Sequence, residues 1–201
     1  MPYSQFTSLR AFKKQFQLTE KNTPFFETVV PMEPTDWLRQ TLGRVLSQQT
    51  AYFSEKSRSE AIVFPVLLEL QHLNNYQFAL YSGAFIEADK EKGLNGECDF
   101  VLSRGEHNIE ISTPFFCIVE AKDNDLELGI PQCAAQMLGA RIFNKMEDLE
   151  TPVIYGCVTT GEHWLLLKLD GQTFFVDSNR YYLKDLPELL GALNMVVRQS
   201  Y

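Results

Sequence analysis

The stretch Phe116-Cys117-Ile118-Val119-Glu120-Ala121-Lys122 reads as a buried β-strand that ends in two charges. Alternate residues of a strand share one face of a sheet, so Phe116, Ile118 and the two charged side chains are expected to point the same way. A face that is first apolar and then ionic is costly to bury unless its charges have partners or a metal. The stretch therefore indicates chemistry rather than packing alone.

A second apolar segment upstream carries a carboxylate of its own. Gly96-Glu97-Cys98-Asp99-Phe100-Val101-Leu102 reads as a strand, with Asp99 in its centre. If the two strands are neighbours, Asp99 and Glu120 come together beside Lys122. Two carboxylates in one place favour a hard divalent cation, because such ions prefer oxygen ligands.

The length and composition are those of a globular protein. At 201 residues and 45% hydrophobic content the chain can bury a core, and a single domain spanning residues 1–201 is expected. No apolar run is long enough to span a membrane, and the first residues lack the basic-then-apolar layout of a signal peptide. Four isolated cysteines are expected to be reduced core residues, which predicts a cytoplasmic location. They are Cys98, Cys117, Cys133 and Cys157.

The charge balance argues against one kind of nucleic-acid binding. The formal net charge is −8, whereas a surface that follows phosphates over a long distance needs a basic face. Acidic residues concentrate between Glu87 and Glu127, around the predicted site, which fits cation binding. For residues 87–91 a solvated acidic loop is the alternative.

Helical and strand periodicities alternate along the chain. Residues 1–34 are expected to form an arm or short helix packed on the core. Helices are predicted from Asp36, capped by Thr35, to about Ala51, and from Ser57 to Leu73, where Pro65 kinks the helix or lies in its first turns. The predicted strands are 76–82, 97–103, 115–121, 153–159, 163–169 and 173–176, and further helices are predicted at 127–144 and 183–197. This order predicts an α/β fold, a mixed β-sheet flanked by helices.

The order of elements and the places of the charges resemble those of the PD-(D/E)XK nuclease superfamily, the restriction-endonuclease-like fold, in an uncharacterised bacterial branch. The matching positions are Asp99, Glu120-Ala121-Lys122 and the helix Pro131-Gln132-Cys133-Ala134-Ala135-Gln136. Glu60 resembles the acidic residue that many members carry on their first core helix. The resemblance covers residues 57–177 and implies an αβββαβ core, here followed by hairpin strands and a last helix.

The resemblance implies a metal-dependent active site. Asp99, Glu120, Glu60 and the carbonyl of Ala121 would hold Mg²⁺, for which Mn²⁺ can substitute. Lys122 would orient the attacking water or stabilise charge in the transition state. Gln132 and Gln136 lie one helical turn apart, and the motif leaves open which of them faces the site. The chain has Cys98 where the name-giving proline of the family can stand.

Each of these site assignments has a structural alternative. Asp99 and Glu120 can be strand-end residues in salt bridges, one of them with Lys122. Ser57 and Glu60 have the spacing of a capping box, in which Glu60 only returns to the backbone of Ser57. A surface position is the alternative for either glutamine.

The function expected from the resemblance is hydrolysis of phosphodiester bonds in nucleic acid, with DNA as the expected partner. The alternative is a catalytically inactive scaffold or interaction protein that has the same fold, which the acidic charge favours. A homodimer is expected, because a second copy would help an acidic chain to build a substrate groove.

Overall fold

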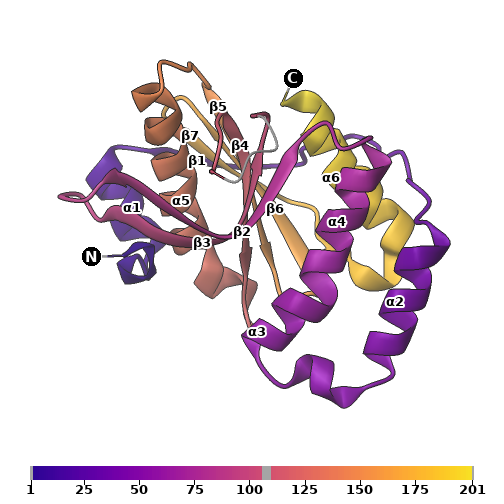
Figure 1. Ribbon diagram of the computed structural model, residues 1–201. Helices are drawn as coiled ribbons and strands as arrows, with labels where there is room; N and C mark the ends of the chain where they lie inside the picture. Colours follow the sequence, from indigo (N-terminus) through magenta and orange to yellow (C-terminus); the bar gives the residue numbers. More distant parts are fainter. Residues whose placement is uncertain (1, 106–109, 201) are drawn as a thin grey trace.

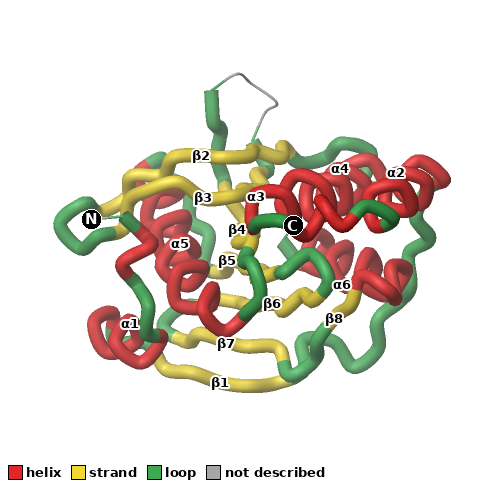
Figure 2. The backbone as a smooth tube through the Cα atoms, turned by 90° about the horizontal axis from the view of Figure 1, so that it is seen from below, coloured by secondary structure: helices red, strands yellow, loops and turns green. Residues whose placement is uncertain are grey.

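The fold is α/β, with one mixed sheet between two layers of helices. The computed structural model describes residues 2–105 and 110–200, and within them eight strands form a single sheet. Seven strands follow the order β1-β7-β6-β5-β4-β3-β2, and β8 pairs with β6 beside them. Figure 2 shows the seven strands stacked in this order, with α1 and α5 on one side and α2, α4 and α6 on the other. The predicted fold class is confirmed.

The strands pair both ways. β1 runs parallel to β7, and β4 runs parallel to β5, whereas the other neighbours are antiparallel. The strands are β1 (Thr19–Thr23), β2 (Ala79–Asp89), β3 (Leu94–Ser103), β4 (Phe115–Ala121), β5 (Val153–Thr159), β6 (His163–Asp170), β7 (Thr173–Asp177) and β8 (Tyr181–Tyr182).

Each face of the sheet has its own hydrophobic core, which explains the two helical layers in Figure 1. One core packs α2, α4 and α6 on the sheet, and the other packs α1, α5 and the first 3₁₀ turn on it. The helices are α1 (Leu9–Phe16), α2 (Asp36–Leu46), α3 (Glu55–Arg58), α4 (Phe64–Leu73), α5 (Leu126–Met146) and α6 (Leu186–Gln199). Short turns of 3₁₀-helix cover Tyr3–Gln5, Gln49–Tyr52 and Leu183–Asp185, and a π-helical turn covers Ser59–Val63.

Strand β4 occupies its predicted range, and all seven of its residues are buried. One detail of the prediction is wrong: Phe116 packs in the opposite core from Ile118. The register of β3 and β4 shifts between Leu102 and Ser103, so that Phe116 is an extra residue on β4. Such a bulge reverses the alternation of faces on one side of it only. The stretch from Cys117 onwards keeps strict pairing and carries Glu120 to the site.

The predicted helix from Ser57 to Leu73 is a helical run from Glu55 to Leu73 with a π turn inside it. Ser54 is its N-cap, since its hydroxyl accepts from the backbone N–H of Ser57. The alternative prediction, a capping box formed by Ser57 and Glu60, is therefore wrong, because the backbone N–H of Ser57 donates to Ser54 instead. Phe64 N–H bonds to the carbonyl five residues back, and Pro65 follows in the first turn of α4, where its missing N–H is tolerated.

Two other boundaries differ from the predictions. Helix α2 ends at Leu46, and Thr35 is its N-cap residue but makes no side-chain cap; its N–H and hydroxyl donate to Glu69 instead. Strand β2 begins at Ala79 and continues to Asp89, so the expected loop at 87–91 is mostly strand. The extension is possible because β2 pairs with β3 throughout and forms the edge of the sheet.

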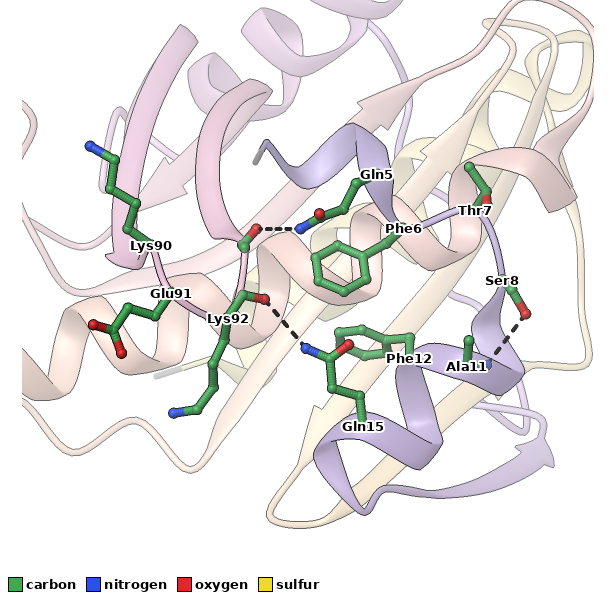
Figure 3. Close-up of a pocket in the computed structure, with 11 residues that line it drawn as sticks. Gln5, Phe6, Thr7, Ser8, Ala11, Phe12, Gln15, Lys90, Glu91 and Lys92 are labelled. Atoms are coloured by element: carbon green, nitrogen blue, oxygen red, sulfur yellow. Dashed lines mark hydrogen bonds between the residues drawn. The ribbon is translucent and has the colours of Figure 1, made fainter.

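Residues of the N-terminal arm belong to both the core and the sheet. Tyr3 and Phe12 are fully buried, and residues 19–23 form the edge strand β1, which the sequence did not predict. Figure 3 shows how the arm meets the turn between β2 and β3: Gln5 donates to the carbonyl of Gly93, and Gln15 donates to that of Lys92. A cavity of about 400 Å³ lies between them.

The four cysteines are buried and unpaired, which confirms their prediction as reduced core residues. Within residues 2–105 and 110–200 no helix has both the length and the apolar character needed to cross a lipid bilayer.

Candidate functional site

The carboxyl end of β4 brings Glu120 and Lys122 into direct contact. Lys122 Nζ lies 2.6 Å from Glu120 Oε1, and the backbone N–H of Lys122 donates to the carbonyl of Thr159 at 2.7 Å. Glu120 is 1% exposed, and the side chain of Lys122 is 17% exposed. The main chain thus continues pairing with β5 beyond the strand, and this pairing holds the lysine at the sheet end.

Asp99 reaches the same place from the neighbouring strand. Its Oδ2 accepts the backbone N–H of Ala121 at 2.7 Å, so the carboxylate lies against the chain between Glu120 and Lys122. Asp99 and Glu120 are close enough that the charge of each group affects the titration of its neighbours. The structure therefore brings together the three residues that the two strand patterns singled out.

Gln136, and not Gln132, faces the site. Gln136 is fully buried on α5, and its Nε2 donates to Glu120 Oε2 at 2.7 Å and to the carbonyl of Glu97 at 3.4 Å. Its Oε1 is buried and has no hydrogen-bond partner among the described residues. Gln132 is partly exposed and makes none of the hydrogen bonds found in the described chain. Both oxygens of Glu120 are thus engaged, one by Lys122 and one by Gln136.

The helical run Glu55–Leu73 supplies a different acidic residue from the one expected. Glu60 is 69% exposed and pairs with Lys56 at 3.8 Å, at the rim of the site. Glu55 lies closer to the centre, with its Oε1 3.9 Å from Lys122 Nζ. Sequence reasoning missed Glu55; the signal that could have found it is the helix start at Ser54, which places Glu55 in the first turn.

A second ion pair fixes the helical run to the loop after β4. Arg58 is mostly buried, and it pairs with Asp123 at 3.1 Å and donates to Asn124 at 3.2 Å. Its guanidinium also lies over the ring of Tyr52, 5.7 Å from the centroid. These contacts hold α3 beside the loop that follows Lys122.

A cavity of about 310 Å³ opens where these elements meet, and most of its charged lining is acidic. Its walls are Glu55, Lys56, Ser59, Glu60, Ser82, Gly83, Glu97, Asp99 and Ala121. Glu97, which sequence reasoning also missed as a site residue, lies two residues before Asp99 on β3. In the described part of the chain, no group of three or more His, Cys, Asp or Glu side chains is arranged to hold a metal ion.

Burial, with smaller effects from neighbouring carboxylates, makes the two central carboxyl groups weak acids. Burial, and then the charge of Asp99, raise the pKa of Glu120 to about 7, against the opposite effects of Lys122 and Gln136. Burial also raises the pKa of Asp99, although its hydrogen bond from Ala121 acts the other way. The pKa of Lys122 is raised, because its acidic neighbours outweigh its burial. The site therefore carries a charged lysine beside two carboxyl groups that resist holding two negative charges.

Comparison with known proteins assigns neither a family nor a function to the chain. No protein-family model matches the chain, and no curated protein matches its sequence. The function rests on the geometry of the site.

Proposed function

We propose that this protein is a metal-dependent nuclease that hydrolyses phosphodiester bonds, with the PD-(D/E)XK resemblance explaining the placement of its site. The observation that carries the proposal is the convergence of Asp99, Glu120 and Lys122 at neighbouring strand ends, beside an acidic cavity. A solely structural ion pair would need one carboxylate for Lys122; here the buried Glu120, the partly buried Asp99 and a third acid, Glu55, lie around it.

The donor set fits Mg²⁺. Magnesium takes one or two carboxylates and keeps waters in its remaining positions, so a cluster of three protein ligands is not required. Asp99, Glu120 and the carbonyl of Ala121 would hold the ion, with Mn²⁺ as substitute. The raised pKa values of Asp99 and Glu120 support this, because burial and the charges of neighbouring carboxylates raise them, and a divalent cation would offset both effects. A bound ion would supply positive charge against the charge that develops on the phosphate.

The protein's own residues have separable tasks in this scheme. Lys122 lies within hydrogen-bond reach of Glu120, where its ammonium can orient a water or stabilise a phosphate oxygen. Gln136 holds the Glu120 carboxylate in one orientation through its Nε2. Glu55 and Glu60 add negative charge at the entrance, with Glu60 the more exposed of the two.

Exposed aromatic side chains beside the site support a nucleic-acid substrate despite the acidic charge. Phe85 is largely exposed and pairs across the sheet with Glu97, which lines the cavity. Phe53 is also largely exposed and lies two residues before Glu55. Unpaired bases stack on such rings, and this part of the binding does not depend on charge. We propose DNA as the substrate and the cytoplasm as the location.

The test is cleavage of labelled single- and double-stranded DNA and RNA by the purified protein with Mg²⁺, Mn²⁺ or EDTA. We expect cleavage with either metal and none in EDTA. Lys122→Met should abolish cleavage, whereas Lys184→Met, which removes an exposed lysine outside the cavity, should retain most of it. Equal residual activity in wild type and Lys122→Met would identify a contaminating nuclease and count against the proposal.

One observation favours the inactive scaffold as a second candidate. Both oxygens of Glu120 already have partners within the protein, so the site is stable without a metal. A scaffold of this kind would show no change in melting temperature with Mn²⁺. A nuclease site should show a rise in melting temperature, because a ligand that binds only the folded state stabilises it.

We also propose a homodimer, in which a second copy extends the substrate groove, since closed two-fold dimers are the commonest oligomers. Light scattering should give twice the monomer mass at high protein concentration. A monomer mass at every concentration would refute the dimer but leave the catalytic proposal unaffected.

A further inference from the structure

A second cavity, separate from the acidic site, lies between the start of α2 and the end of α4. Its volume is about 390 Å³, and it shares no lining residue with the cavity around Asp99. Its walls are Thr35, Trp37, Leu68, Glu69, His72 and Tyr76. Three aromatic rings, one of them the imidazole of His72, an aliphatic side chain, a threonine and a carboxylate thus surround one space.

The carboxylate in this cavity has no formal positive charge beside it. Glu69 is 1% exposed, and its oxygens accept from the backbone N–H and the hydroxyl of Thr35, at 2.5 and 3.0 Å. No lysine, arginine or histidine of the described residues lies within salt-bridge distance of it. Thr35 is the N-cap of α2, so Glu69 also faces the partly positive end of that helix.

The helix end explains why Glu69 can be buried, but it leaves a full negative charge in the cavity wall. A helix terminus carries only about half an elementary charge, and that charge is spread over several N–H groups. A buried carboxylate is stabilised much further by a cation in contact range. The cavity beside Glu69 is where such a cation can enter.

The aromatic walls favour the same kind of occupant. Trp37 is 47% exposed and Tyr76 is 55% exposed, although both are large and partly apolar. The ring of Tyr76 is oriented by His72, whose Nδ1 lies 3.0 Å from the tyrosine hydroxyl. Tryptophan and tyrosine faces attract cations, and alkylated ammonium groups gain most because they are weakly hydrated.

We propose that this cavity binds a quaternary ammonium group. The aromatic faces of Trp37 and Tyr76 contact the methyl groups, and Glu69 supplies the opposite charge. An anion would be repelled by Glu69, and a neutral apolar group would use the rings but not the carboxylate. The site is independent of the proposed nuclease activity, since it uses none of the same side chains.

The experiment compares choline with 3,3-dimethylbutan-1-ol, a neutral molecule of the same shape, at equal ionic strength. Ligand-observed nuclear magnetic resonance measures both affinities and needs no tryptophan signal. Quenching of Trp37 fluorescence gives a second readout in wild type, because the other tryptophan, Trp164, is fully buried. We expect saturable choline binding that is at least about tenfold tighter than that of the neutral analogue, as a cation–π contact with a nearby carboxylate predicts.

Variants separate the two contributions. Trp37→Leu and Glu69→Gln should each weaken choline binding about tenfold, within the range of a desolvated cation–π contact or a charge-assisted contact. Tyr182→Leu is the matched control, because Tyr182 is a partly exposed tyrosine that also packs edge-on against a histidine, His163, but does not line this cavity. It should bind choline as wild type does.

Nε-trimethyllysine, tested beside choline, carries the same trimethylammonium group on an amino-acid side chain. Tighter binding of choline would indicate a choline-type small molecule as the natural ligand, and tighter binding of trimethyllysine would indicate a methylated lysine. Equal binding of choline and the neutral analogue would overturn the proposal, since the cavity would then be only apolar. The proposal would also be overturned if neither ammonium ligand saturated the cavity at about 100 mM, because that concentration is about one hundred times the dissociation constant of a millimolar site.

Discussion

The carboxyl group of Glu120 is subject to opposing effects, some of which raise its pKa and some of which lower it. It is buried beside Asp99, and burial is the main reason why its pKa rises to about 7. Lys122 and Gln136 act in the opposite direction through hydrogen bonds to its two oxygens. Since burial together with the charge of Asp99 outweighs these bonds, the charged form of Glu120 is less favourable here than in water.

Removing one of the two charges should therefore separate a metal site from a structural ion pair. We expect Asp99→Asn and Glu120→Gln to abolish the rise in melting temperature with Mn²⁺ while melting in EDTA at or above the wild-type temperature. The reason is relief of the repulsion that the charge of Asp99 exerts on the buried Glu120. Thermal melting of the three proteins with and without Mn²⁺ measures both effects.

The opposite result has a clear meaning. In a structural salt bridge, Glu120→Gln leaves Lys122 without its closest partner and costs about 3–5 kcal/mol, the usual penalty for breaking a buried pair. Clear destabilisation of both variants in EDTA, together with no manganese response in wild type, would mean that the cluster is structural.

The same residue predicts how stability depends on pH. The pKa of Glu120 is higher in the folded protein than its ordinary value of 4.5, so between these pKa values the folded state binds more protons than the unfolded state. The free energy of unfolding should therefore fall as pH rises from about 4.5 to 7, by at most about 3 kcal/mol from this group. Denaturant unfolding in EDTA at several pH values measures the slope. Glu120→Gln should flatten it, and an unchanged slope would assign the effect to other groups.

Residues whose place follows from strand geometry were predictable, and those placed by tertiary contacts were not. Asp99, Glu120 and Lys122 lie in or directly after apolar strands, so their meeting follows from sheet pairing. Choosing Gln136 over Gln132 needed the rotation of α5 about its own axis, which one turn of spacing does not fix. Glu55 depends on the start of a helix at Ser54, which the Ser57–Glu60 pattern obscured.

At the scale of elements, the packing of α5 on the strand ends positions Lys122. Gly129 in the first turns of α5 lies so close that an added Cβ would meet Val158 Cγ1 at 2.5 Å and Lys122 Cγ at 2.8 Å. Val158 is buried in β5 and β-branched, so it cannot move aside easily. The absence of a side chain at Gly129 is what lets the helix approach the lysine.

Gly129→Ala should therefore destabilise the protein by about 1–3 kcal/mol, the usual cost of overpacking. It should also lower any nuclease activity, through displacement of Lys122. Gly43→Ala is the matched control, because Gly43 is also helical but an added Cβ there meets nothing within 4 Å. That variant should be stabilised by about 0.5–1 kcal/mol, the propensity gain of alanine in a helix. Equal effects of the two substitutions would contradict the close packing of α5.

The elements that were predicted well are those whose pattern alone determines their burial. Strands β4 and β5 match their predicted ranges, because both are nearly continuous apolar runs, as expected for central strands with neighbours on both sides. Strand β1 was missed because its sequence Thr-Glu-Lys-Asn-Thr is exposed along its whole length and has no alternation. Strand β1 forms because it pairs with β7, which lies far away in the chain, and the local sequence of β1 does not indicate this pairing.

At the scale of the whole molecule, the N-terminal arm, residues 1–34, is an integral part of the fold. It buries Tyr3 and Phe12 in the core beneath α5 and adds β1 to the edge of the sheet. Removing residues 1–23 should therefore abolish cooperative folding, because losing two buried aromatic side chains at about 3–5 kcal/mol each approaches the whole stability of a domain.

The test is thermal melting and solubility of the truncated chain beside full-length Lys21→Ala. Lys21 lies in the exposed strand β1, so this control keeps the strand and both aromatic side chains, and it should melt within a few degrees of wild type. A truncated protein that melts cooperatively near the wild-type temperature would show that the arm is dispensable.

The pairing of β1 with β7 also determines the order in which the chain can be completed during synthesis. Thr19 hydrogen-bonds to Thr173, 154 residues further along, so the first strand emerges from the ribosome long before its partner exists. Contacts of such long separation close slowly, because the loop between them must be ordered first. Until β7 has emerged, β1 has no partner strand, and in this interval a chaperone could protect the unpaired segment from misfolding.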